Sequence, residues 1–176
     1  NSDLPLMAKG FESPEGRSIF SDLIHTGEEP GFSVTPIYNS KLVRGAYQRP
    51  PEGNPTLEAF EAKIRLLEGS EAAVSMTCGV AAITQALLAF LRSGDRIVSH
   101  RCVYVWITTL FNEYFPQWGI EVKWVDMTDL DQVKQALKEK KTKIVYFEPY
   151  PNPSMDLLDA PALIGLAKDA GAMTWV

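Results

Sequence analysis

Cysteine and histidine are scarce in this sequence. Its 176 residues include two cysteines and two histidines. Cys78 and Cys102 form no C-x-x-C motif, and His25 and His100 lie far in sequence from each other and from any acidic cluster with metal-ligand spacing. We therefore expect neither a disulfide framework nor a zinc or other metal site.

Basic runs and long apolar runs are also missing. The formal net charge is −5, and no block of basic residues marks a surface for nucleic acid or an anionic membrane. No apolar run approaches the roughly 18 residues of a membrane span, and the first residues lack the apolar core of a signal peptide. These absences predict a cytoplasmic protein that binds neither nucleic acid nor membrane.

The glycine fingerprints of nucleotide-binding proteins are absent as well. The sequence contains no G-x-G-x-x-G and no G-x-x-x-x-G-K-[ST], which argues against a nicotinamide or nucleoside-triphosphate site. Hydrophobic residues nevertheless make up 45% of the chain and aromatic residues 10%, as is typical of a globular protein with a substantial core.

The composition changes near residue 55. Residues 1–55 are rich in Pro, Gly and Ser without a sustained period, which predicts an extended arm with one short helix near residues 19–23. Asn54 and Pro55 then form a helix start, and Gly69 ends it. The apolar residues of this predicted helix recur at helical spacing: Leu57, Phe60, Ile64 and Leu67.

The rest of the chain alternates between strand and helix patterns. Strands are predicted at residues 72–76, 96–99, 120–125, 143–147 and 172–176, and helices at residues 80–91, 104–115, 130–137 and 161–169. Right-handed crossovers then favour an α/β fold with a mainly parallel sheet, which binds ligands at the carboxyl ends of its strands. Because the apolar strand AMTWV is the last segment, we expect the chain to be part of a larger protein.

Two loops in this pattern carry candidate ligand-binding groups. In AAVSMTCGVAAI the amides of Gly79, Val80 and Ala81 start a helix, where the helix dipole favours an anion such as phosphate. We attribute to Gly79 backbone angles that are closed to other residues. The same stretch also fits an ordinary strand–helix turn that contains a glycine.

The second loop is KIVYFEPYPNPSM. Glu148 and Asn152 follow a buried strand, and prolines at 149, 151 and 153 stiffen the loop, so a site there would be preorganised. The Asn152 amide can donate a hydrogen bond to a phenolate-type oxygen. Alternatively, Asn-Pro is simply a turn former.

Three further residues are candidates. Tyr104 begins the helix that follows a sheet strand and could stack on a flat ring, although a core or interface tyrosine is the common case. Tyr47 and Arg49 lie in YQRPPEGNPT, where a guanidinium and a phenol suit a phosphate; an exposed arginine in such a loop is otherwise simply solvated.

Over residues 24–176 the motifs, in order, closely resemble one enzyme family. The matching stretches are IHTGEEP, TPIYNS, YQR with GNPT, FEAKIRLLEGSEAAVSMTCGVAAI, SGDRIVSHRCVY and TKIVYFEPYPNPSMDLLD through AKDAGAMTWV. They are similar to the pyridoxal 5′-phosphate (PLP) enzymes of cysteine and methionine metabolism. This family includes cystathionine γ-synthase, cystathionine γ-lyase, methionine γ-lyase and O-acetylhomoserine sulfhydrylase.

The resemblance implies a fold and roles for these residues. It implies an aspartate aminotransferase-like, fold type I architecture, with residues 1–55 as an arm and residues 56–176 as the first half of the large PLP-binding domain. Gly79 and Val80 would bind the cofactor phosphate, and Tyr104 would stack on its ring and assist proton transfer. Asn152 would bond the ring hydroxyl, with Glu148 nearby.

The resemblance also implies an assembly. Tyr47 and Arg49 would reach the phosphate of a neighbouring subunit, in a homotetramer built as a dimer of dimers. The family's cofactor-binding lysine and ring-nitrogen aspartate would lie beyond Val176, so we expect this chain to lack the catalytic lysine and to need a C-terminal portion or a second chain. Lys143 begins a strand, at the end away from the ligand, and is not assigned this role.

The function implied is γ-elimination or γ-replacement on sulfur-containing or O-acylated homoserine-type amino acids. A non-catalytic truncated homologue that acts as a binding or regulatory subunit is the alternative, and an unrelated α/β phosphate binder is a third possibility. The sequence departs from the family pattern in the inserted PPEG, in Val105 and Trp106 after the stacking tyrosine, and in Cys78, where serine is usual.

Overall fold

The structure, a computed structural model, describes residues 21, 23–24, 37, 42–43, 46–47 and 54–176, of which 42–43 and 46–47 are described as backbone alone. The chain forms two compact units, Asn1–Met76 and Thr77–Val176. Among the described residues no helix combines the length and apolar character needed to cross a membrane. The predicted arm boundary near residue 55 stays a prediction.

The first unit contains the predicted helix and a short hairpin. Helix α2 spans Pro55–Glu68, and strands β1 (Leu42–Val43) and β2 (Ala46–Tyr47) pair antiparallel. The Asn54 side chain accepts a hydrogen bond from the Thr56 N–H at 2.8 Å, and Gly69 ends the helix at φ 61°. The cap, the start and the end of α2 are therefore as predicted.

The predicted strand at residues 72–76 is wrong, because those residues have no regular secondary structure. A strand requires a neighbouring strand to accept and donate its backbone hydrogen bonds. Here the backbone N–H and the hydroxyl of Ser75 instead donate to Glu61 Oε1, at 2.6 and 2.7 Å. A side chain of α2 thus takes the place of a partner strand.

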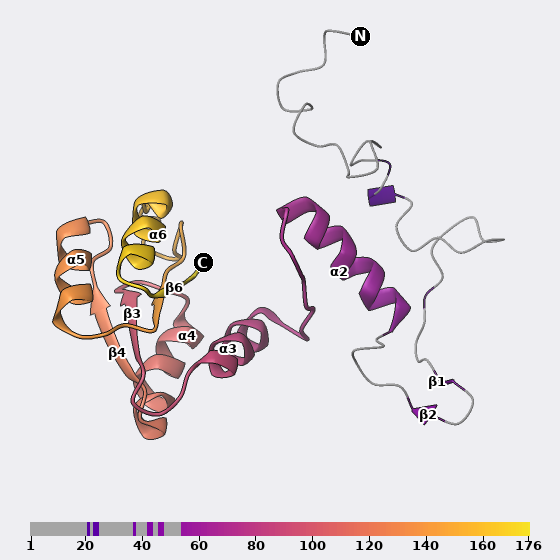
Figure 1. The fold of residues 1–176 in the computed structure, drawn as a ribbon, viewed down its shortest axis with the longest axis horizontal. Coiled ribbons are helices and arrows are strands. Elements are labelled where there is room, and N and C mark those ends of the chain that lie inside the picture. The colour runs from indigo at the N-terminus through magenta and orange to yellow at the C-terminus, as the bar shows by residue number, and fades with distance from the viewer. Residues whose placement is uncertain (1–20, 22, 25–36, 38–41, 44–45, 48–53) are drawn as a thin grey trace, which may run out of the picture. The chain divides into compact units, whose positions relative to one another are not determined.

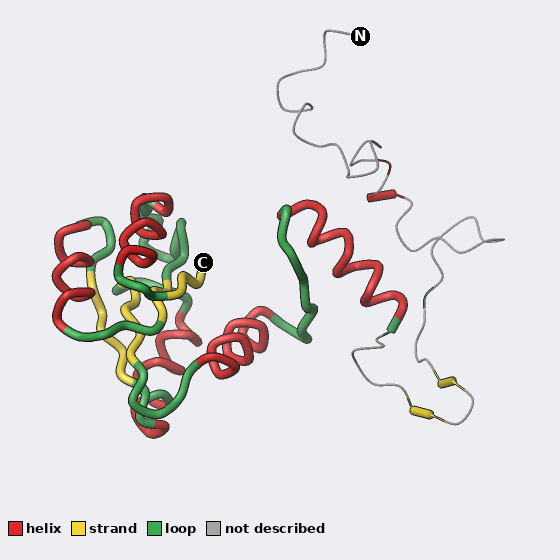
Figure 2. The backbone as a smooth tube through the Cα atoms, in the orientation of Figure 1, coloured by secondary structure: helices red, strands yellow, loops and turns green. Residues whose placement is uncertain are grey.

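The second unit is built on a parallel sheet. Its four strands lie in the order β4-β3-β5-β6 and all pairs are parallel, which confirms the predicted α/β class. The strands are β3 (Arg96–His100), β4 (Glu121–Val125), β5 (Ile144–Tyr146) and β6 (Met173–Trp175). The helices are α3 (Gly79–Phe90), α4 (Val105–Thr109), α5 (Leu130–Glu139) and α6 (Ala160–Asp169), as Figures 1 and 2 show.

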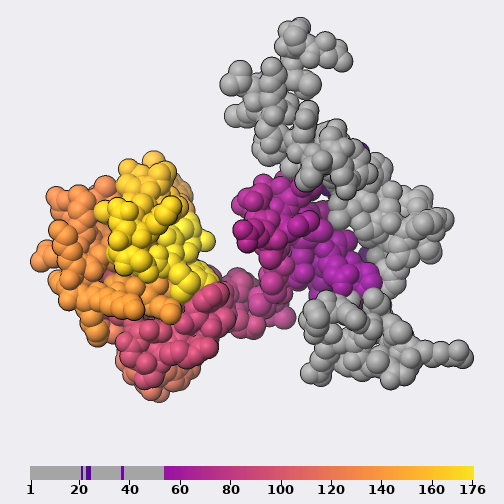
Figure 3. All heavy atoms as spheres, in the orientation of Figure 1, coloured from indigo at the N-terminus to yellow at the C-terminus, as the bar shows by residue number. Residues whose placement is uncertain are grey.

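Alternating strand residues divide the core of this unit between the two sheet faces. Ile97 and Ile144 join a cluster with α3 and α4, whereas Val98 and Val145 join a second cluster with α5 and α6. The orange and yellow segments that hold α5 and α6 lie together at the surface in Figure 3. Helices therefore cover both faces, and a ligand would bind at the carboxyl ends of the strands, as in other parallel sheets.

The predicted helix at residues 104–115 changes its winding halfway. After α4 the segment Leu110–Tyr114 is a π-helix, in which the Phe115 N–H donates to the carbonyl of Leu110 five residues earlier, at 3.0 Å. Phe111 and Phe115 are both buried and their ring centroids lie 5.1 Å apart. The wider turn thus keeps both rings in the core.

A buried arginine joins α5 to the sheet. Arg96 is 3% exposed and its Nη1 donates to the carbonyls of Ala136 and Lys140, at 3.0 and 3.2 Å. Its Nε lies 3.0 Å from Glu121 Oε1, and its Nη2 lies 3.3 Å from Glu139 Oε2. The Arg96 guanidinium thus binds carbonyls at the C-terminal end of α5, where positive charge is favourable.

Candidate functional site

The carboxyl ends of the parallel strands bring together two of the predicted site residues. Because all four strands run in one direction, the residues after β3 and after β5 meet at one edge of the sheet. Tyr104 follows β3 and Glu148 follows β5. Glu148 Oε1 accepts a hydrogen bond from the backbone N–H of Tyr104 at 2.9 Å.

Glu148 also contacts a tyrosine that the sequence interpretation missed. The hydroxyl of the buried Tyr146 donates to Glu148 Oε1 at 3.3 Å. Burial, followed by the nearby carboxylate, raises the pKa of the Tyr146 phenol above its usual range, so this phenol stays protonated. The available signal was strand alternation, since Tyr146 and Glu148 stand two residues apart on one face.

The Tyr104 side chain is open to solvent. It is 42% exposed, and among the described residues no aromatic ring stacks on it. Its carbonyl accepts hydrogen bonds from the N–H groups of Ile107 and Thr108, at 2.9 and 3.0 Å, so its backbone starts α4. The residue thus combines a fixed backbone with an accessible ring.

Gly79 is the first residue of α3, and no side chain caps that helix at Cys78. Its φ is not in the left-handed region, so the predicted use of unusual backbone angles is wrong. A Cβ built at Gly79 would meet nothing within 4 Å. The next residue, Val80, packs against the core cluster that contains Val103 and Tyr146. The glycine thus leaves open space beside the first amides of the helix, which the Cys78 side chain does not cap.

Asn152 lies in a loop that is closed by its own backbone bonds. The Met155 N–H donates to the Pro151 carbonyl at 2.8 Å, and the Leu158 N–H donates to the Pro149 carbonyl at 3.0 Å. The Asn152–Pro153 peptide is cis, and the Asn152 side chain is exposed. The amide is therefore available to a ligand.

The remaining two predicted residues belong to the first unit. Tyr47 is in strand β2 and only its backbone is described, while Arg49 lies outside the described residues. Their predicted contact with a neighbouring subunit's phosphate stays a prediction.

The sequence interpretation set His100 apart from acidic residues, yet the fold places it beside them. His100 Nε2 lies 3.9 Å from Asp156 Oδ2, and burial lowers the pKa of its imidazole although the nearby Asp126 opposes this. His100 ends β3 and Asp156 belongs to the loop of Asn152. The contact depends on how the loop after β5 folds back toward the end of β3, so the sequence carried no direct signal for it.

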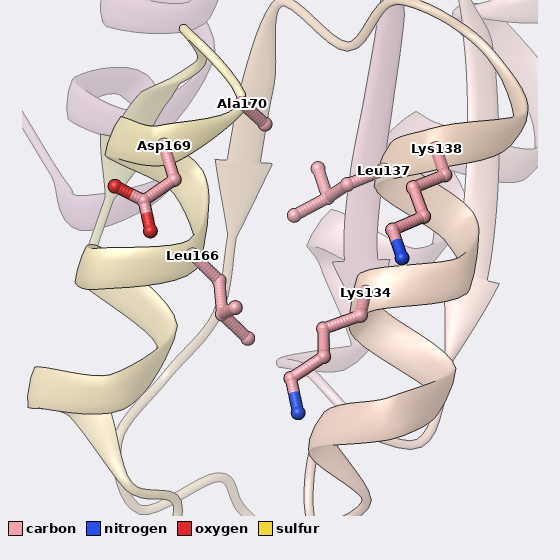
Figure 4. A pocket seen from close by; sticks show the side chains of 6 residues that line it. All are labelled: Lys134, Leu137, Lys138, Leu166, Asp169 and Ala170. Carbon is pink, nitrogen blue, oxygen red and sulfur yellow. The ribbon is translucent and has the colours of Figure 1, made fainter.

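A surface hollow of about 260 Å³ lies elsewhere, between α5 and α6. Figure 4 shows its apolar floor, Leu137 and Leu166, with two lysines on the α5 side. Its lining residues are Lys134, Leu137, Lys138, Leu166, Asp169 and Ala170, and none of them is a predicted site residue. This hollow is separate from the candidate site.

Curated relatives resemble this chain over about two thirds of its length. O-succinylhomoserine sulfhydrylase of Mycobacterium tuberculosis is 40% identical over 120 residues, which cover 68% of this chain and 29% of that protein. Cystathionine beta-lyase MetC of Bacillus subtilis is 36% identical over 132 residues, 75% of this chain and 33% of that protein. The chain thus spans about a third of their length.

Solved structures agree with these relatives. The crystal structure of metB from Corynebacterium glutamicum matches with a TM-score of 0.79 and 28% identity, covering 92% of this chain and 45% of that chain. O-acetylhomoserine sulfhydrylase of Wolinella succinogenes matches with a TM-score of 0.64 and 32% identity, covering 68% of this chain and 34% of that chain.

The profile of the Cys/Met metabolism PLP-dependent enzyme family matches residues 33–176. This match confirms the resemblance that the sequence motifs indicated, and with it the cofactor, pyridoxal 5′-phosphate. The chain belongs to the Cys/Met metabolism PLP-dependent enzyme family.

Proposed function

We propose that this chain is part of a PLP-dependent lyase or transferase that acts on sulfur-containing or O-acylated homoserine-type amino acids by γ-elimination or γ-replacement. The names of its relatives, a beta-lyase, gamma-lyases and sulfhydrylases, support this substrate class. The observation that carries the proposal is the Glu148–Tyr104 hydrogen bond, which fixes the backbone that carries an accessible tyrosine ring at the ligand edge of the sheet.

The described residues fit this cofactor. The open space at Gly79 and the uncapped start of α3 suit a phosphate, since a helix N-terminus favours an anion. The exposed ring of Tyr104 suits a flat heterocycle, and the exposed Asn152 amide suits a ring hydroxyl. These groups suit the phosphate, the ring face and the ring hydroxyl of pyridoxal phosphate.

In the proposed mechanism each residue has one task. The Gly79 and Val80 N–H groups would bind the phosphate, and the Asn152 amide would donate to the ring hydroxyl. Tyr104 would face the ring, and its phenol oxygen would hold or transfer a proton, while Glu148 fixes the backbone from which that phenol extends. Bound pyridoxal phosphate supplies an electron sink for charge that develops on the amino-acid substrate.

The proposal includes an assembly. Tyr47 and Arg49 would complete the phosphate site of a neighbouring subunit, and the cofactor-binding lysine would come from outside residues 1–176. Val105 and Trp106 directly follow Tyr104 and are 62% and 60% exposed, which supports a further protein surface against them. Lys143 directly precedes β5, at the end opposite Glu148, and is not the proposed lysine.

Cofactor binding by the complete protein tests the proposal. The visible spectrum is recorded with added PLP before and after borohydride, and peptide mapping then identifies the reduced lysine. We expect a borohydride-sensitive band and a label outside residues 1–176. A protein that stays colourless with added cofactor would favour a non-catalytic subunit, and a label on Lys143 would contradict the assigned site.

A tyrosine pair tests the role of Tyr104. Tyr104→Phe should lower turnover by about a hundredfold, the typical size of a lost acid–base group, and leave cofactor retention nearly unchanged. Tyr114→Phe is the matched control, because Tyr114 is a similarly exposed tyrosine (48%) in the π-helical segment and packs on Trp118. Equal losses of turnover and cofactor in Tyr104→Phe would mean that its proposed role is wrong.

A further inference from the structure

His100 is held in one tautomer at the end of β3. Its side chain is fully buried, and its Nδ1 accepts a hydrogen bond from the Met127 backbone N–H at 3.0 Å. A nitrogen that accepts carries a lone pair, so the proton of the neutral ring is on Nε2. His100 therefore presents an N–H donor on its other side.

That donor faces the loop of Asn152. His100 Nε2 lies 3.9 Å from Asp156 Oδ2, both atoms are buried, and neither has a hydrogen-bond partner among the described residues. Asp156 Oδ2 also lies 3.9 Å from Arg101 Nη2, while Arg101 Nε pairs with Asp126 Oδ2 at 2.9 Å. Arg101 Nη2 is thus as close to the Asp156 oxygen as His100 Nε2 is, but Arg101 is 57% exposed and His100 is fully buried, so His100 is the water-excluded donor of the two.

Among the described residues, Asp156 makes the charged contacts of this loop with the end of β3, through His100 and through the adjacent Arg101. Its two backbone bonds, Met155 to Pro151 and Leu158 to Pro149, join the loop to itself. These two bonds determine the shape of the loop. Its position relative to the ends of the strands must come from contacts with other segments. The contact of Asp156 with His100 reaches from the loop to the last residue of β3.

We propose that His100 and Asp156 are a positioning pair, in which the Nε2–H group holds the carboxylate and thereby sets where Asn152 meets the cofactor ring. This inference rests on the proposed role of Asn152. A loop movement of about 1 Å toward β3 brings the two atoms to hydrogen-bond length. The charged groups that face His100 are Asp126, Arg101, Asp156 and Glu148.

The complete protein, saturated with added PLP and free of it, tests this pair. His100→Asn keeps an acceptor near Nδ1 for Met127 and removes the donor, whereas His100→Gln keeps a donor near Nε2 and removes the acceptor. Asp156→Ala removes the carboxylate. The readouts are the PLP dissociation constant and hydrogen exchange of the backbone amides in residues 150–157, with the melting temperature as a check of folding.

We expect His100→Asn and Asp156→Ala each to raise the dissociation constant about tenfold, the effect of losing one charge-assisted hydrogen bond, and to speed exchange in the loop. The double variant should have about the same PLP dissociation constant as each single variant. His100→Gln should raise this constant less than His100→Asn does. The proposed pair would be wrong if the effects of His100→Asn and Asp156→Ala on the dissociation constant were additive. It would also be wrong if His100→Asn left both PLP affinity and hydrogen exchange unchanged.

Two outcomes separate this inference from the proposed function. If Asn152→Ala weakens PLP binding and His100→Asn does not, the positioning pair alone is wrong. If the unaltered protein binds no PLP, the proposed function fails and the positioning role fails with it.

Discussion

The carboxylate of Glu148 accepts the backbone N–H of Tyr104 at 2.9 Å and the hydroxyl of Tyr146 at 3.3 Å. Helix α4 has no side-chain cap at Tyr104 itself. A carboxylate from the neighbouring strand end therefore stands at the start of this helix, where negative charge is favourable. Glu148 is thus better described as the residue that places Tyr104 than as a group near the cofactor.

Replacing Glu148 should weaken cofactor binding through Tyr104. We expect Glu148→Ala to raise the PLP dissociation constant about tenfold, because a charged hydrogen bond of about 1.5 kcal/mol is lost. Glu148→Gln is the control, since its amide oxygen still accepts the Tyr104 N–H. Equilibrium dialysis measures both constants. Identical affinity in the alanine variant and the unaltered protein would refute this role.

PLP affinity should depend on the charge of the side chain at position 152. Asn152→Ala removes a donor, and we expect PLP affinity to fall about tenfold. Asn152→Asp should be weaker still, because a carboxylate repels the ring oxygen that the amide is proposed to bind. Ser154→Ala, at an exposed position in the same loop, is the control. If Asn152→Asp binds as well as Asn152→Ala, the ring hydroxyl is not the partner.

His100 should make stability depend on pH. Burial lowers its pKa in the folded protein below the ordinary value of 6.5. As the pH falls below about 6.5 the unfolded chain takes up the proton first, so stability is lost until the pH passes the folded pKa. Protonation would also place an N–H at Nδ1, opposite the Met127 N–H. Urea denaturation at several pH values from 7.5 to 5.0 measures the free energy of unfolding, which should decrease less for His100→Asn than for the unaltered protein. The same dependence on pH in both proteins would exclude His100 as the cause.

Arg96 should contribute strongly to stability. Arg96→Met leaves the carbonyls of Ala136 and Lys140 and the carboxylates of Glu121 and Glu139 without this cation. We expect the free energy of unfolding to fall by about 2 kcal/mol, because two carbonyls at the end of α5 lose a charged donor; Glu121 and Glu139 are partly exposed and stay hydrated. Urea denaturation of the complete protein measures it.

Arg92→Met is the matched control for that substitution. Arg92 also donates to carbonyls, those of Leu88, Ala89 and Leu91, but it is an exposed residue at the end of α3. Its loss should change the free energy of unfolding by less than about 1 kcal/mol. Equal effects of the two substitutions would mean that burial of Arg96 has no special importance.

The sequence predicted those elements that local signals define. The start of α2 is marked by Asn54 and Pro55, and its end by Gly69. The pattern of apolar residues along the chain located the strands β3 to β6. The predicted strand at residues 72–76 failed because strand formation depends on a partner far away in the sequence. The π-helical turn was missed because the rings of Phe111 and Phe115 fit either winding until the core around them is known.

The candidate site was predictable to a similar degree. The parallel sheet and the family motifs were enough to select Tyr104 and Glu148 for one edge. The hydrogen bond between them involves a backbone N–H, which no residue type reveals. The approach of His100 to Asp156 depends on how the loop after β5 folds back, and charge spacing along the chain carries no such information.

The π-helical segment Leu110–Tyr114 also indicates where this helix tolerates a change of length. A π turn equals an α turn with one extra residue, so deleting a residue there restores ordinary winding without moving Tyr104. Homologues that differ by one residue between Tyr104 and Gly119 are therefore best aligned with the gap inside this turn. A gap placed at Tyr104 would pair the wrong residues across the cofactor edge.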